Sequence, residues 1–300
     1  MNAQRVALGT WALGGGNDWG QTSPADAQDT LSAALDNGIN FIDTAPIYGA
    51  GVAEQQIGHA LKGRRTQVLL ATKCGITLAG GRPDHDLRPQ SILTQCENSL
   101  RRLQTDYIDL YQIHWPDPKV PLADTLEALT RLQQQGKIRA IGVCNFSRAQ
   151  VEEASALAPI VSVQGQLSLL YPASQELAAF CHSREICFWA YGVLGGGILS
   201  GKYKQAPNLR RCDARRYFYK YYFGDGFAAA AQVAARVVQV ARQKQVPPAV
   251  VALASVLEVP GVSGVLVGAR SVQQVQENVC AQSVSLTPQE QDFLWNRCKK

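Results

Sequence analysis

Residues 108–144, IDLYQIHWPDPKVPLADTLEALTRLQQQGKIRAIGVC, alternate between two kinds of pattern. Ile108–His114 and Ile138–Cys144 are apolar almost throughout, as expected for parallel strands that are covered on both faces. Between them, Leu122–Gln135 repeats leucine at helical spacing and ends before Gly136. This stretch therefore predicts a strand, a helix and a second strand in succession.

The same alternation extends over the rest of the chain. Six further strands are expected, at Val6–Gly9, Asn40–Asp43, Gln67–Lys73, Ile160–Gln164, Ile186–Tyr191 and Val262–Val267. Helical patterns cover Ala25–Asn37, Gln90–Leu103, Ser147 (as a cap) to Ala156, Ala173–Ser183, Gly226–Gln245, Ser271–Ala281 and Thr287 to about Lys299.

Eight strand–helix alternations in 300 residues predict a single α/β domain over residues 1–300. The expected fold is a (β/α)8 TIM barrel of parallel strands with its active site at the C-terminal rim. A doubly wound sheet is the main alternative. It usually carries Gly-x-Gly-x-x-Gly after its first strand, and Gly14-Gly15-Gly16 lacks that spacing.

Composition restricts the class of protein. The content of 46% hydrophobic and 18% charged residues is ordinary for a globular chain. No apolar window is long enough to cross a membrane, and the N-terminus lacks a signal-peptide pattern, so we expect a soluble cytoplasmic protein without a membrane partner. The net charge of +5 is modest and gives little reason to expect a nucleic-acid partner.

Cysteine and histidine usage predicts neither a metal site nor a disulfide framework. The chain has eight cysteines without a Cys-x-x-Cys pair, and only four histidines. Cys74, Cys144 and Cys187 lie in or beside runs that are expected to be buried strands. Reduced and mostly buried thiols are therefore predicted.

Four residues that can transfer or stabilise protons fall at the ends of consecutive strands. Asp43 ends the second strand and Tyr48 follows it, whereas Lys73 and His114 end the third and fourth strands. Each has a structural alternative: a turn aspartate, a loop aromatic, a satisfied core histidine. Lys73 is the hardest to explain in this way, because a lysine that closes an apolar run must find a partner. All four are expected on one rim of the barrel.

This combination suits reduction of a carbonyl group. Tyrosine has a pKa near 10 in water, and a nearby ammonium lowers it by stabilising the phenolate. Asp43 would hold Lys73 charged, and His114 would orient a carbonyl or assist proton transfer. The hydride must come from a cofactor, because no side chain supplies it.

Several blocks carry a family resemblance. They are Asn40–Gly49, Ala71–Lys73, Tyr107–His114 and Lys137–Phe146. With them the chain resembles the aldo-keto reductase family from Gly9 to Asn278, and is nearer to bacterial-type members and the potassium-channel β subunits than to vertebrate aldose reductases. The resemblance implies an NADP-dependent oxidoreductase in which Asp43, Tyr48, Lys73 and His114 form the catalytic tetrad. It would reduce an aldehyde or ketone to an alcohol, or catalyse the reverse, as a monomer or homo-oligomer acting on a small molecule.

The resemblance also implies how the cofactor is bound. The residues concerned are Thr10, Trp11, Asp43, Cys144, Asn145, Gln164, Tyr191, Gly192, Val193, Leu194, Gly195, Lys202, Gly268, Arg270, Gln274, Glu277 and Asn278. Asn145 and Gln164 would hold the carboxamide, and Tyr191 would stack on the nicotinamide. Cys144 stands where many members have serine.

The implied cofactor is NADPH in preference to NADH, with NAD still possible. Arg270 would grip a 2′-phosphate, helped by Lys202, Arg210 or Arg211. The backbone of residues 192–195 would contact the pyrophosphate, because small residues let donors come close.

Aromatic residues are candidates for substrate contact. Trp11, Tyr48, His114 and Trp115 would touch the substrate, with Trp19 as a further candidate. The basic and aromatic segment 202–223 is open to several interpretations: a solvated loop, a phosphate-facing loop, a packing or subunit contact, or a wall of the substrate site. Aromatic walls would suit an aromatic or sugar-like substrate.

Two other functions compete with a reductase. One is a regulatory protein that binds the nucleotide with little turnover, as the channel β subunits do. The other is a lyase or isomerase in which Lys73 forms a Schiff base. The complete set of four residues favours the reductase.

Overall fold

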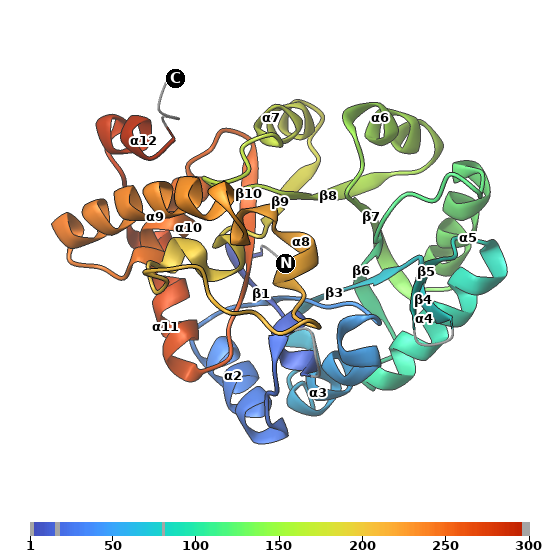
Figure 1. Ribbon diagram of the computed structural model, residues 1–300. Coiled ribbons are helices and arrows are strands. Elements are labelled where there is room, and N and C mark those ends of the chain that lie inside the picture. The colour runs from blue at the N-terminus through green and yellow to red at the C-terminus, as the bar shows by residue number, and fades with distance from the viewer. Residues whose placement is uncertain (1–2, 16–18, 80–81, 296–300) are drawn as a thin grey trace.

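The computed structural model describes residues 3–15, 19–79 and 82–295, in which parallel strands close into a barrel (Figure 1). Around the barrel the order is β1, β10, β9, β8, β7, β6, β3 and β2, so the first strand pairs with the last. The strands are β1 (Val6–Gly9), β2 (Phe41–Asp43), β3 (Leu69–Cys74), β6 (Ile108–Ile113), β7 (Ile138–Cys144), β8 (Ile160–Gln166), β9 (Cys187–Tyr191) and β10 (Val262–Gly268). The predicted (β/α)8 barrel is confirmed.

Helices surround the barrel, as Figure 1 shows. They are α2 (Pro24–Asp36), α3 (Val52–Ala60), α4 (Pro89–Leu103), α5 (Leu122–Gln134), α6 (Arg148–Leu157), α7 (Gln175–Ser183), α9 (Asp225–Lys244), α10 (Pro248–Leu257), α11 (Val272–Cys280) and α12 (Pro288–Trp295). Ser23 and Ser147 cap α2 and α6 through their side chains. The part of the expected last helix beyond residue 295 lies outside the described residues.

The prediction from sequence missed α3 and α10. All residues of α10 from Val250 to Leu257 are buried. A helix that is apolar on every side has no amphipathic stripe by which to recognise it. The start signal was nevertheless present, because Pro248 occupies the first turn.

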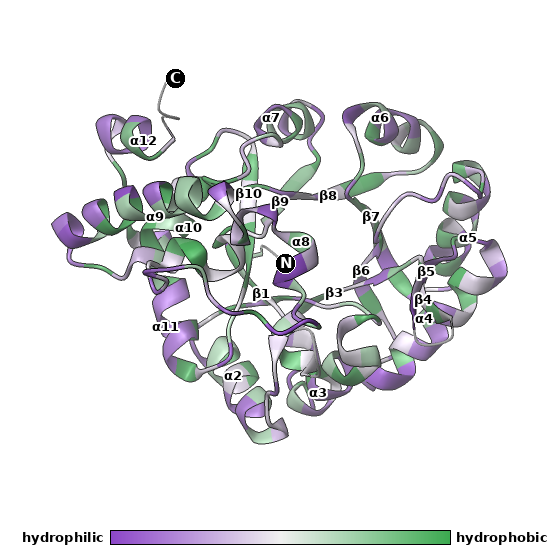
Figure 2. Ribbon diagram, in the orientation of Figure 1, coloured by the Kyte–Doolittle hydropathy of each residue, from purple (hydrophilic) through white to green (hydrophobic). Residues whose placement is uncertain are grey.

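The interior of the barrel is divided into an apolar layer and a polar layer. Ala7, Phe41, Ala71, Leu110, Trp189 and Leu266 form the apolar cluster. Within it, the rings of Phe41 and Trp189 pack edge to face with centroids 4.5 Å apart. Nearer the C-terminal ends of the strands, Asp43, Lys73, Gln112 and Gln164 are all buried. A second apolar cluster lies between the strands, which are largely green in Figure 2, and the inner faces of the helices.

Gly264 marks a place where two parts of the chain come too close for a side chain. A Cβ atom there would lie 2.3 Å from Cζ3 of Trp189 and 2.6 Å from the carbonyl oxygen of Arg5. We expect Gly264→Ala to lower the free energy of unfolding by about 1–3 kcal/mol, because the overpacked core must shift. The midpoint of urea denaturation measures this loss.

Gly268→Ala, in the same strand, is the matched control. Its Cβ atom would meet only the carbonyl oxygen of Gly9 at 3.6 Å, and we expect a change within about 0.5 kcal/mol. Equal losses in the two variants would contradict the packing argument.

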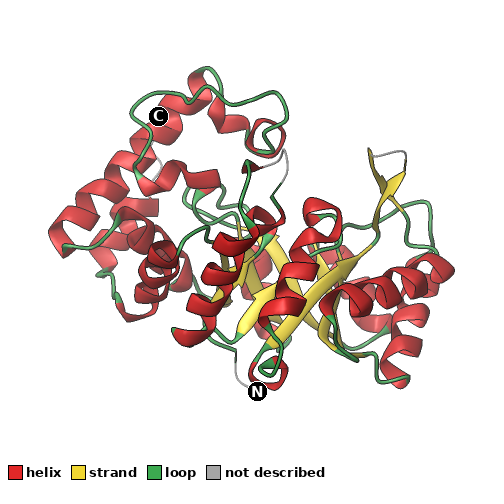
Figure 3. Cartoon of the chain, turned by 90° about the horizontal axis from the view of Figure 1, so that it is seen from below, coloured by secondary structure: helices red, strands yellow, loops and turns green. Residues whose placement is uncertain are grey.

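Two segments outside the barrel strands extend the C-terminal rim of the barrel. A hairpin of β4 (Ile76–Ala79) and β5 (Arg82–His85) follows β3 directly and stands away from the barrel in Figure 3. The long connection after β9 carries α8 (Arg215–Phe218), which is seen across the barrel opening in Figure 1.

The described cysteines are free thiols. Cys74, Cys96, Cys144 and Cys181 are buried, but Cys187 is exposed, contrary to the prediction. It is the first residue of β9, at the N-terminal end of the barrel, where only the following residues of the strand are covered. In the described ranges, no helix has the length and apolar character to cross a membrane.

Candidate active site

The four predicted proton-transferring residues meet at one cavity of about 720 Å³. Asp43 and Lys73 come from the C-terminal ends of β2 and β3. Tyr48 begins the 3₁₀ turn in the loop after β2, and His114 directly follows β6. The ring centroids of Tyr48 and His114 are 6.1 Å apart in an edge-to-face arrangement. The structure thus brings together residues that lie up to 71 positions apart (114 − 43).

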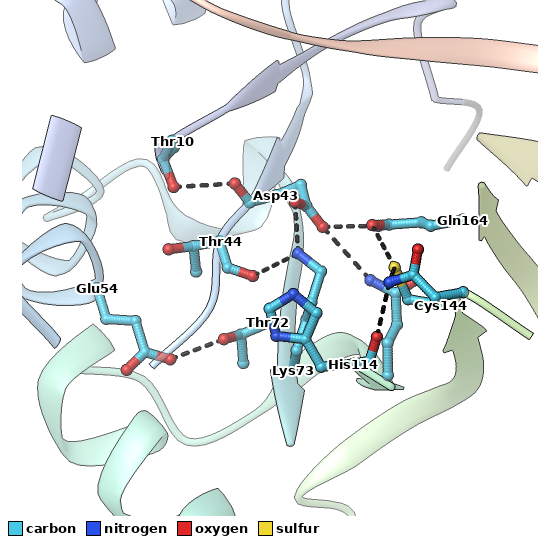
Figure 4. A network of polar contacts seen from close by, with 11 residues as sticks. Thr10, Asp43, Thr44, Glu54, Thr72, Lys73, His114, Cys144 and Gln164 are labelled. Atoms are coloured by element: carbon cyan, nitrogen blue, oxygen red, sulfur yellow. Dashed lines mark hydrogen bonds and ion pairs between the residues drawn. The ribbon is translucent and has the colours of Figure 1, made fainter. Parts of the chain in front are cut away.

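Asp43 and Lys73 form a buried ion pair at the floor of this cavity (Figure 4). Lys73 Nζ lies 2.6 Å from Asp43 Oδ2 and donates a second hydrogen bond to the carbonyl oxygen of Thr44 at 2.9 Å. The other carboxylate oxygen, Oδ1, accepts hydrogen bonds from Gln164 Nε2 at 2.7 Å and from Gln112 Nε2 at 3.4 Å. Both oxygens of the carboxylate therefore have partners, as a buried charge requires.

A close backbone approach sets the position of Tyr48. Gly49, which follows it, has φ +58°, and a Cβ atom there would lie 2.1 Å from the carbonyl oxygen of Gly14. Glycine at both positions lets the 3₁₀ turn Trp11–Gly14 press against the turn that begins at Tyr48. As a result, the ring of Trp11 stacks on that of Tyr48 with centroids 5.7 Å apart and an interplanar angle of 18°.

Burial and neighbouring charges together set the pKa values of these groups. Burial lowers the pKa of Lys73, but the Asp43 carboxylate, with smaller contributions from Tyr48 and Cys144, outweighs this effect, so the pKa of Lys73 rises and the ammonium stays charged. Burial and the charge of Lys73 together hold the pKa of His114 well below its usual value, so the imidazole is neutral.

The expected lowering of the Tyr48 pKa was wrong, because the pKa is raised. Burial raises the pKa of Tyr48 to about 12, although Lys73 opposes the rise. Lys73 Nζ lies 5.2 Å from the centre of the Tyr48 ring. The ammonium therefore offsets only part of the cost of ionising a phenol in an apolar site.

The side chains expected to hold a carboxamide are gathered beside His114. Asn145 has φ +63°, a left-handed conformation that asparagine adopts more readily than most residues. Its Nδ2 donates to the carbonyl oxygen of His114 at 3.0 Å, and its Oδ1 accepts from the hydroxyl of Tyr191 at 2.6 Å. Cys144 Sγ lies 3.2 Å from Asn145 Nδ2 and 3.7 Å from Gln164 Oε1.

The opposite end of the cavity is basic and rich in glycine. Lys202 and Arg270 line it, together with the start of α11. Gly196 and Gly197 have positive φ values, and a Cβ atom on Gly197 would lie 3.1 Å from Lys202 Nζ. The backbone at Gly196 and Gly197 carries no side chains and lies beside the Lys202 ammonium, and such a surface fits a phosphate group. The volume also lies in the range of small-molecule sites, so the residues present fit a dinucleotide.

Most of the predicted site residues line this cavity. They are Thr10, Trp11, Asp43, Tyr48, Lys73, His114, Trp115, Cys144, Asn145, Gln164, Tyr191, Gly192, Val193, Leu194, Lys202, Gly268, Arg270, Gln274, Glu277 and Asn278. Gly195 is buried beneath the surface instead, because it begins the 3₁₀ segment Gly195–Ser200 and Gly196 and Gly197 come to the wall. Arg210 and Arg211 are also not among the lining residues, and Arg211 faces a separate surface depression beside Arg216.

The prediction from sequence missed part of the substrate end. Ile76 and Pro83 reach the cavity from the hairpin, and Ile47 reaches it from the loop before Tyr48. The Gly80-Gly81 pair, a strong turn signal between two short runs, lies outside the described residues but was visible in the sequence. Phe218 and Tyr217 line the same cavity, which favours the interpretation of segment 202–223 as a wall.

Comparisons with known proteins agree with this geometry. Residues 5–294 match the Aldo/keto reductase family. The aldo-keto reductase YhdN of Bacillus subtilis is 42% identical over 220 residues, which span 72% of this chain and just under two thirds (66%) of that protein. The NADH-specific methylglyoxal reductase of Escherichia coli is 33% identical over 303 residues, or 96% of this chain and 92% of that one. The structure of the glycerol dehydrogenase from Gluconobacter oxydans matches with a TM-score of 0.89 and 34% identity, covering 97% and 90% of the two chains.

Proposed function

Because the chain belongs to the aldo/keto reductase family, whose members bind nicotinamide cofactors, we propose that it reduces an aldehyde or ketone with Tyr48 as the general acid. The observation that supports this most directly is the buried Lys73–Asp43 ion pair, which lies under Tyr48 at the floor of a cavity with a basic far end. A candidate proton donor and a basic region that would suit an anionic cofactor therefore line one cavity.

Each of the four residues has a distinct part in the proposed reaction. The nicotinamide cofactor, when bound, supplies the hydride that reaches the carbonyl carbon. Tyr48 gives its phenolic proton to the carbonyl oxygen, and the Lys73 ammonium stabilises the phenolate that is left. Asp43 keeps Lys73 charged and in place. His114 is neutral and donates a hydrogen bond that orients the carbonyl oxygen.

We propose that NADPH is preferred over NADH. Lys202 and Arg270 bring positive charge to the end of the cavity that would receive the adenosine phosphates. Gln274 and Asn278, on α11, line the same end. The NADH-specific relative makes the comparison of the two nucleotides part of the test.

The walls around the proton donor favour a substrate with an apolar or aromatic substituent. Ile47, Ile76, Pro83, Trp115 and Phe218 line this end of the cavity. Apolar walls with a few convergent polar groups orient a ligand by its single polar group, here the carbonyl. Aromatic aldehydes are therefore the first substrates to test, with a sugar-like aldehyde as the polar comparison.

The test is a panel of aldehydes with NADPH and with NADH, followed by the loss of absorbance of the reduced nucleotide. We expect turnover with aromatic aldehydes and a lower KM for NADPH than for NADH. Tight nucleotide binding with no turnover across the panel would support a regulatory binding protein instead. Trapping of a substrate on Lys73 by borohydride would support Schiff-base chemistry.

The pH dependence of reduction should be flat around neutrality. Because the pKa of Tyr48 is about 12, the acid stays protonated and its activity is lost only as the pH rises towards that value. The pKa of His114 is depressed, so this residue introduces no change above about pH 7. We expect kcat/KM for the aldehyde to stay level from about pH 7 to about pH 9. A fall with a midpoint inside that window would contradict the assignment of Tyr48.

A further inference from the structure

Arg270 connects two segments that line the cavity and lie far apart in the sequence. It follows β10, and its Nη1 and Nη2 donate hydrogen bonds to the carbonyl oxygens of Trp19 at 3.1 Å and Gln21 at 3.0 Å. Its own backbone nitrogen donates to Gln274 Oε1 at 2.9 Å, at the start of α11. The guanidinium therefore ties segment 19–21 to the end of the cavity where the adenosine half of a dinucleotide would lie.

Trp19 carries this connection to the proton donor. Its ring packs edge to face on Trp11 with centroids 5.5 Å apart, and Trp11 stacks on Tyr48. All three rings line the same cavity. A displacement of the Trp19 backbone therefore changes the ring contacts that form the wall of the cavity beside Tyr48.

The free edge of the Arg270 guanidinium can still take an anion. An arginine has five N–H donors, and the two carbonyl bonds occupy one on each terminal nitrogen. Among the described residues no carboxylate pairs with Arg270, and its Nε has no hydrogen-bond partner. Nε and the second hydrogen of Nη2 form a side-on pair of the kind that binds phosphate.

We propose that Arg270 is a positioning residue that couples a 2′-phosphate at the adenosine end to the shape of the substrate pocket. The phosphate binds the free edge of the guanidinium and thereby fixes segment 19–21. Trp19 then holds Trp11 against Tyr48. This inference rests on the proposed function, and it makes Trp19 a determinant of substrate binding that responds to the choice of nucleotide.

Hydrogen exchange with adenosine fragments tests the coupling without turnover. The probes are adenosine 2′,5′-bisphosphate and adenosine 5′-monophosphate, which lacks the 2′-phosphate. In the unmodified chain we expect only the bisphosphate to slow exchange at residues 19–22 and 10–14. At saturation both probes should slow exchange at the start of α11, which shows that the site is filled. Equal protection of residues 10–14 and 19–22 by both probes would overturn the proposal.

Two variants and a control separate coupling from binding. In Arg270→Met, the bisphosphate should protect α11 at saturation but no longer protect residues 10–14 and 19–22. In Trp19→Ala, protection should remain at 20–22 and be lost at 10–14. Arg211→Met removes a surface guanidinium that faces a different depression, and it should behave as the unmodified chain. Protection of residues 10–14 that survives both Arg270→Met and Trp19→Ala would contradict the proposed path.

Kinetics supply an independent readout. We expect the KM for benzaldehyde to be about fivefold or more lower with NADPH than with NADH, and this ratio to fall towards one in Arg270→Met and Trp19→Ala. A ratio that is unchanged in both variants, in a chain that reduces benzaldehyde, would overturn the coupling and leave the proposed reductase intact. Absence of all turnover would count against the reductase, while the exchange experiment would still decide the coupling.

Discussion

Tyr48→Phe is expected to lower kcat for aldehyde reduction by about 10³-fold, because general acid catalysis contributes roughly 10²–10⁴ in rate. The variant keeps the ring that stacks on Trp11 and loses only the hydroxyl that would deliver the proton. No other described side chain on the floor of the cavity replaces it: Lys73 is committed to Asp43 and Thr44, and His114 is neutral. Initial rates at saturating aldehyde measure the effect.

Nucleotide binding should be unaffected in this variant, and titration of the intrinsic fluorescence checks it. Tyr217→Phe is the matched control, because Tyr217 lines the same cavity but is 75% exposed, and its hydroxyl donates to the carbonyl oxygen of Arg211. We expect little change in its kcat. If Tyr48→Phe retained full activity, the proton would have to come from another group and the proposed acid would be wrong.

Lys73→Met should be the most destabilising substitution in the site, by about 3–5 kcal/mol, because it leaves the Asp43 carboxylate buried without its cation. In the unmodified chain the pKa of Lys73 is raised: burial lowers it, and Asp43, together with Tyr48 and Cys144, raises it by more. A raised pKa contributes stability that is fully present below the unfolded value of about 10.4, and that is lost as the pH rises through the folded value. The deficit should therefore be equal at about pH 7 and about pH 9, as measured by urea denaturation.

Two comparisons isolate the buried charge. The double variant Asp43→Asn/Lys73→Met removes both charges and should recover part of the lost stability. Arg148→Met breaks an exposed ion pair with Glu152 and should cost at most about 1 kcal/mol. A Lys73→Met chain as stable as the Arg148→Met chain would show that the Asp43 carboxylate is not stranded.

The fold and the placement of the four candidate residues around one cavity were predictable from sequence because both depend on where strands end. Parallel strands in a closed barrel finish at the same rim, so a polar residue that closes an apolar run is assigned to the site without any knowledge of its neighbours. Asp43, Lys73 and His114 satisfy this rule, and the structure places them around one cavity.

What the sequence could not supply depends on contacts between distant segments. The partners of Arg270 lie about 250 positions away in the sequence. No pattern in the residues around Arg270 predicts that its guanidinium donates to the carbonyl oxygens of Trp19 and Gln21. The pKa of Tyr48 likewise follows from the balance between burial and the ammonium of Lys73, and only the folded arrangement determines that balance.

The pairing of β1 with β10 has a consequence for synthesis of the chain. Val6 pairs with Val265 and Leu8 with Val267, so the barrel remains open until residues 262–268 have left the ribosome. Until then, the backbone groups of Val6–Gly9 on that side are an unpaired edge, which is available to other nascent chains.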